Sequence, residues 1–183
     1  MHGYNGKDLA RSFRTVRQNT IQIAEEIPED KYDFRPSEGT RSVAETLRHI
    51  ACSFMWVPDV HGNRVTQLNF EMFRDGMAKQ AQAEAALKTK ADILGALRTN
   101  GETIATFMEK FPEEALAEHV NMPPEGGMPA KTRFEMLLSP KEHEMHHRGQ
   151  LMVVERMLGI VPHLTRQMQE RMAAMNQRQA TGA

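Results

Sequence analysis

Two histidines four residues apart are the residues of this chain best spaced for chemistry. They are His143 and His147. On a helix, residues four apart project from one face about one turn from each other, so both imidazoles can reach the same metal ion. The same face continues with apolar residues at helical spacing, namely Met136, Pro140, Leu151, Val154 and Leu158. The pattern predicts a histidine pair that points into a helical core, either as metal ligands or as packed core residues.

A third ligand is needed, because two histidines rarely hold a catalytic metal alone. His49 is a candidate in the middle of another predicted helix. It lies at the edge of that helix's apolar stripe, where a side chain faces either a neighbouring helix or solvent. Periodicity leaves the choice open.

The other histidines are expected at the periphery. His61 and His119 fall in predicted loops and His163 follows a proline, so we expect them at the surface. His2 lies in an end expected to be disordered. His146 points about 100° away from His147 on a helix, which favours a surface position or an interhelical hydrogen bond.

The segment 143–147 also matches His-Glu-x-x-His, in which the glutamate of a zinc protease acts as general base. The longer form of that motif fails, because Gln150 replaces its glycine and Val153 its third histidine. A zinc hydrolase is therefore the weaker alternative, with Glu144 as its general base. Arg148 is a further candidate catalytic residue, because it could meet an anionic substrate. Glu144 can also orient a ligand's second nitrogen. The simpler interpretations are a solvated helix charge for Glu144 and an interhelical ion pair for Arg148.

Composition excludes several classes of protein. The 183 residues carry a net charge of −1, which gives no support to nucleic-acid binding. A single cysteine, Cys52, excludes an internal disulfide and is expected to be a buried packing residue. No apolar run approaches the roughly 18 residues of a membrane span, and no signal-peptide core precedes the first helix. These features predict a cytoplasmic protein that binds neither nucleic acid nor membrane.

The predicted elements are almost all helical. Apolar periodicity and capping boxes predict four long helices and a shorter terminal one. Pro140 is expected to kink or split the fourth helix. The expected helices cover about residues 7–27, 42 to 58 or 62, 88–110, 132–158 and 164–177.

Two segments allow alternatives. Residues 61–87 are expected to form an ordinary crossover connection, with a short helix or a lid as the alternative. Met168, Met172 and Met175 line one face of the terminal segment, which predicts core cover first and a dimer contact second. No strand pattern is present. The expected fold is all-α: an antiparallel four-helix bundle with one long crossover and a short C-terminal helix. It forms one domain over residues 1–183, with a core at about 8–165.

Two separated motifs give the chain a family resemblance. Arg-Ser-Val-Ala-Glu-Thr-Leu-Arg-His-Ile-Ala covers residues 41–51, and His-Glu-Met-His-His-Arg-Gly-Gln covers residues 143–150. Ile-Pro-Glu at 27–29 and Leu-Gly-Ile-Val-Pro at 158–162 are further matching pieces. Together they resemble the DinB-like superfamily over about residues 8–165.

The resemblance implies a four-helix bundle that is frequently dimeric, with a metal triad at His49, His143 and His147. Such sites commonly hold nickel or zinc, with water at open positions. The wider superfamily includes thiol-dependent S-transferases and a mycothiol-dependent maleylpyruvate isomerase. The resemblance thus implies a metal-dependent transferase that uses an external low-molecular-weight thiol and a small-molecule substrate. The alternative is a non-enzymatic metal-binding or stress-associated bundle.

Overall fold

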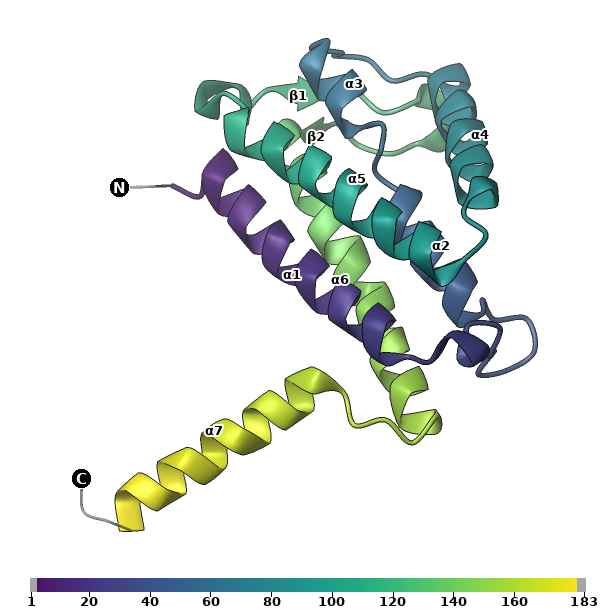
Figure 1. The fold of residues 1–183 in the computed structure, drawn as a ribbon. Helices are drawn as coiled ribbons and strands as arrows, with labels where there is room; N and C mark the ends of the chain where they lie inside the picture. Colours follow the sequence, from purple (N-terminus) through teal and green to yellow (C-terminus); the bar gives the residue numbers. More distant parts are fainter. Residues whose placement is uncertain (1–2, 181–183) are drawn as a thin grey trace.

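A computed structural model describes residues 3–180, and its architecture is the all-α bundle that the sequence predicts (Figure 1). Four helices form the body, of which α2 is the shortest with 10 residues. Within the described residues none of the helices is long and apolar enough to cross a membrane. The bundle helices are α1 (Gly6–Glu26), α2 (Val43–Cys52), α5 (Lys90–Lys110) and α6 (Arg133–Met157). The other elements are η1 (Glu29–Lys31), α3 (Val57–Gly62), α4 (Phe70–Ala86), η2 (Glu113–Ala115), β1 (His119–Val120), η3 (Pro124–Gly126), β2 (Lys131–Thr132) and α7 (His163–Ala180).

The helix directions follow from the single long connection between α2 and α5. α1 packs against α5 and α6, and α2 packs against the same two helices. α1 and α5 are antiparallel, as are α2 and α6, whereas α1 and α6 run in the same direction (Figure 1). The connection carries α3 and α4 back along the bundle, so that α5 begins at the end where α2 began.

Capping explains where the bundle helices begin. Ser42 with Glu45 and Thr132 with Glu135 form the reciprocal hydrogen bonds of a capping box, as predicted. The other two bundle helices begin with the same arrangement, using an asparagine or threonine cap and an aspartate three residues later. Pro140 lies inside α6, but the helix is continuous and is not split there.

The connection 61–87 corrects the prediction of an ordinary crossover. The predicted second helix ends at Cys52, α3 follows, and residues 70–86 form the long helix α4. None of the residues of α4 is buried, and it packs against α2 only along one side. Its weak apolar face explains why periodicity did not reveal it. The two-residue strands β1 and β2, which pair antiparallel, were also not predicted.

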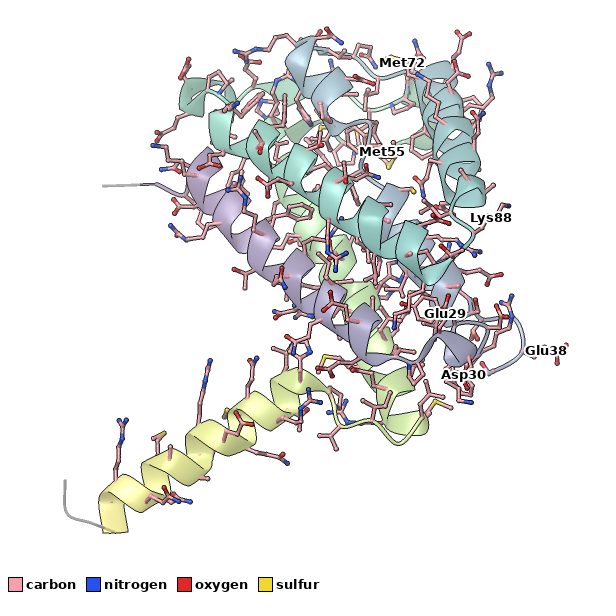
Figure 2. All side chains as sticks on the ribbon, viewed as in Figure 1. Glu29, Asp30, Glu38, Met55, Met72 and Lys88 are labelled. Atoms are coloured by element: carbon pink, nitrogen blue, oxygen red, sulfur yellow. The ribbon has the colours of Figure 1, made fainter. Side chains whose placement is uncertain are left out.

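The terminal helix α7 corrects a second prediction. Met168, Met172 and Met175 do not cover the core, since they are 58%, 47% and 56% exposed. Figure 2 shows α7 extending away from the body, with its side chains spread into solvent. Its start is attached to α1 through a hydrogen bond between His163 and Asn19 and an ion pair between Arg166 and Glu26.

A buried ion pair lies between the two main apolar clusters of the bundle. Arg17 of α1 and Glu144 of α6 approach to 2.9 Å, and both are almost inaccessible to solvent. The Arg17 guanidinium also donates to the carbonyl oxygens of Leu97 on α5 and Ile50 on α2. One side chain of α1 therefore contacts the other three bundle helices. Gly101 makes room for it, because a Cβ atom there would lie 2.8 Å from Arg17 Cγ.

We predict that Arg17→Met destabilises the bundle by about 3–5 kcal/mol, because it leaves the Glu144 charge buried without its partner. The double variant Arg17→Met/Glu144→Met is expected to recover most of this loss, because no uncompensated charge remains. Urea unfolding measures both. The control is Arg14→Met on the same helix, which removes only exposed ion pairs and should cost less than about 1 kcal/mol. Additive losses in the double variant would contradict the prediction.

A second buried acid lies near the base of α7. Both carboxylate oxygens of Glu155 are buried without a hydrogen-bond partner among the described residues. Burial, together with the nearby charge of Glu26, raises the pKa of Glu155 to about 7. At Glu155 the folded protein therefore holds up to one proton more than the unfolded chain does between about pH 4.5 and pH 7.

We predict that Glu155→Gln stabilises the protein at alkaline pH. The folded pKa lies above the unfolded one, so wild-type stability falls as the pH rises through this window and the carboxylate becomes charged. Glutamine keeps the shape without the charge, so the variant should gain roughly 3 kcal/mol over wild type at pH 9 and almost nothing at pH 4. Thermal or urea unfolding across pH tests this, with the exposed Glu142→Gln as control. Parallel stability curves for wild type and Glu155→Gln would refute it.

Candidate metal centre

The three histidines singled out in the sequence meet at the contact between α2 and α6. One ring nitrogen from each of His49, His143 and His147 lies within 4.8 Å of the other two. The Nε2 atoms of His49 and His143 are 3.0 Å apart. Three nitrogens at 2.0–2.1 Å from one tetrahedral ion would be separated by about 3.4 Å. The observed spacing is thus close to that of a three-histidine metal site.

His49 is oriented by helix α4. Its Nδ1 atom lies 3.3 Å from Oε1 of Glu84, and a carboxylate can only accept, so Nδ1 carries the proton. The amide nitrogen of Gln80 lies 3.2 Å from the same Nδ1, but it donates to Glu84 at the shorter distance of 2.7 Å. With its proton on Nδ1, His49 turns a free lone pair on Nε2 toward His143.

His147 is oriented from within its own helix. Its Nδ1 atom lies 2.9 Å from Oε1 of Gln150, one turn further along α6. The Gln150 amide nitrogen faces Nε2 of His146 at 3.2 Å. Because the amide donates from its nitrogen, its oxygen accepts the Nδ1 proton of His147. His146 is exposed and takes the surface position that the sequence predicts.

The surroundings favour the neutral form of all three imidazoles. Burial lowers the pKa of His49 and His147. Burial, the neighbouring histidines and the charge of Arg41 together lower the pKa of His143 to about 4. Arg41 also contributes to the lowered pKa of His49 and His147. Neutral imidazole is the form that binds a metal ion, so this environment favours ligation over protonation.

Glu144 lies between the two α6 histidines in sequence but does not face the centre. It is 1% exposed and accepts hydrogen bonds from Arg17, so its interpretation as a solvated charge was wrong. The same contact occupies the carboxylate that a zinc hydrolase would need as its base. Arg148 makes no ion pair within residues 3–180, and its Nε atom is buried without a hydrogen-bond partner there.

Two of the three histidines that the sequence predicts at the surface, His61 and His163, are buried instead. His61 is fully buried in α3, where Nδ1 lies 3.3 Å from Arg133, and His163 is 1% exposed. Both sit where short segments pack onto the bundle, which periodicity does not reveal. His119 is exposed, as expected, although in β1. His2 lies outside the described residues.

Sequence reasoning missed the groups that orient the ligands. Gln150 stands three residues after His147, and this spacing could have revealed it. Glu84, Gln80 and Ser53 surround Nδ1 of His49, but only the fold brings α4 to them. Cys52 is buried, and burial raises the pKa of its thiol to about 11, as a packing residue requires. Trp56 packs against Phe54 and His61.

Comparisons with known proteins identify relatives of this chain. The model of the DinB superfamily matches residues 12–151. "Uncharacterized protein YjoA" of Bacillus subtilis (strain 168) is 29% identical over 151 residues, which cover 82% of this chain and 89% of that protein.

Solved structures agree with the fold. The crystal structure of YjoA, described as a DinB-like protein, covers 82% of this chain and 91% of its own at a TM-score of 0.60 and 26% identity. An uncharacterized protein from Clostridium difficile 630 shares the fold at a TM-score of 0.60 and 13% identity, covering 85% of this chain and 98% of its own. The resemblance predicted from the two motifs is confirmed: the chain belongs to the DinB superfamily.

Proposed function

We propose that this protein binds one divalent metal ion, zinc or nickel, through His49, His143 and His147. One observation carries the proposal. His49 and His147 have their Nδ1 protons held by fixed acceptors, which leaves each Nε2 lone pair free, and the ring nitrogens of all three histidines converge. Converging lone pairs repel one another unless a cation or a proton lies between them.

The donor set fits such an ion. Three neutral imidazoles are typical ligands of zinc and suit nickel equally well. A three-histidine site also leaves coordination positions open, as catalytic sites do. When bound, the ion would supply a Lewis acid that polarises or activates a small molecule beside it.

We further propose that the activity is a transfer reaction with an external low-molecular-weight thiol and a small-molecule substrate. Cys52, the only cysteine, is buried with a raised pKa, so the chain offers no reactive thiol of its own. A cavity beside His147 provides space for a small molecule. A homodimer is proposed as the working state, and the exposed methionines of α7 are a candidate contact.

We predict that wild-type protein binds one equivalent of zinc or nickel and that His143→Ala loses it. Mass-spectrometric metal analysis after dialysis measures the stoichiometry. The matched control is His119→Ala, which removes an exposed histidine far from the cluster in sequence and should keep the metal. Equal metal content in wild type and His143→Ala would contradict the ligand assignment.

The thiol reaction has a separate test. Metal-loaded wild type is incubated with several low-molecular-weight thiols and varied electrophiles, and conjugates are measured by mass spectrometry. Conjugation that disappears in His143→Ala supports the transferase. Stoichiometric metal without any conjugation favours the non-enzymatic bundle. Metal-dependent peptide cleavage that is lost in Glu144→Gln would instead support the hydrolase.

We predict that Glu84→Ala weakens zinc binding about 10- to 100-fold, because His49 loses the acceptor that keeps its proton on Nδ1. Competition with a chromophoric chelator measures the affinity. Glu71→Ala is the matched control, since Glu71 is an exposed acid on the same helix. An equal loss in both variants would indicate a general charge effect and would disprove the orienting role.

A further inference from the structure

A cavity of about 680 Å³ adjoins the histidine cluster, between the segment before α2 and the second half of α6. Its size is that of a site for a small molecule. His147 and Gln150 line it on the α6 side, so it opens directly onto the candidate metal centre. Its remaining walls include Arg41, Thr46, Leu151 and Val154.

The charge of the cavity's lining favours a negatively charged ligand. None of its lining residues is acidic. Arg41 is its only lysine or arginine, and this guanidinium makes no hydrogen bond or ion pair with any residue that the structure describes. The neighbouring Arg35 is already held by Glu45. Glu38, the acid nearest in the same loop, points outward at the loop tip (Figure 2).

The segment that carries Arg41 is held in place before any ligand arrives. Arg35 donates to the carbonyl oxygen of Thr40, and the Thr40 hydroxyl donates to that of Ser37. The backbone N–H groups of Val43 and Ala44 donate to the carbonyl oxygens of residues 34 and 32. A cation on an ordered loop needs little reorganisation to bind an anion.

We propose that this cavity binds a small carboxylate-bearing molecule, whose acid group pairs with Arg41 and whose body lies along α6 toward His147. The proposal rests on the proposed metal site, because the ligand's other end would reach the ion. A guanidinium matches a carboxylate with two parallel hydrogen bonds. Pro36, Val153 and Val154 also line the cavity and offer apolar contact to carbon atoms of the ligand.

The arrangement also couples the two sites. Arg41 and His147 line the same cavity, so a divalent ion at the histidines brings a second positive charge to the cavity that Arg41 lines. A carboxylate between them offsets this repulsion. Zinc and the carboxylate should therefore each strengthen the binding of the other by the same factor.

The experiment titrates succinate into zinc-loaded and metal-free protein by calorimetry, and zinc into protein with and without succinate. Arg41→Met should weaken succinate binding by about 10- to 100-fold, with zinc affinity in the absence of succinate not reduced. Arg74→Met, which removes an exposed arginine of α4, is the matched control and should match wild type. Arg41→Lys is expected to recover part of the affinity.

The outcomes separate the two proposals. If zinc binds and Arg41→Met binds succinate as well as wild type does, the carboxylate site is overturned and the metal site stands. If zinc does not bind, the metal site fails, and the metal-free titration decides the cavity: succinate binding that depends on Arg41 supports it, and its absence overturns it. Inorganic phosphate that binds more tightly than succinate would overturn the carboxylate class.

Discussion

The contact between Arg17 and Glu144 is the constraint on which the arrangement of the bundle depends. Burying two charges costs several kcal/mol, and only close pairing with further hydrogen bonds offsets that cost. Arg17 meets these terms by bonding to α6, α5 and α2 together. Its partners Ile50 and Glu144 directly follow His49 and His143 in sequence. Any sliding of α2 against α6 would break these bonds, so the ion pair also holds the relative position at which the histidines meet.

The sequence predicted those features that depend on local spacing. Residues within a few positions of one another determine three of these features: the shared face of His143 and His147, the two capping boxes and the all-α bundle. The direction of His49 does not, because it stands at the edge of an apolar stripe and tertiary packing alone decides which way it turns. Glu144 was interpreted as solvated because its partner lies 127 residues away. No local pattern can reveal a contact over that separation.

Helix α4 shows that a segment can shape a site while contributing little to the core, since Ala83 is its partly buried residue against the main apolar cluster. It buries no residue, yet it brings Glu84 and Gln80 to the side of His49 that faces away from the cluster. Gln80 and Glu84, which contact the histidine, are polar residues on the side of α4 that faces α2. Polar residues on this face make the helix hard to predict from apolar periodicity, and they also orient His49 at the candidate centre.

The projecting helix α7 is expected to unfold locally far more easily than the bundle does. An isolated helix of 18 residues is marginal in water, because most helical stability in proteins comes from packing an apolar face. The first turn of α7 is tied to the body through His163, Thr165 and Arg166, whereas the methionines further along the helix are about half exposed. In the monomer, its later backbone amides should therefore exchange their hydrogens quickly, while those of α6 open only with the bundle. Slow exchange along all of α7 would be a direct sign that another surface covers it.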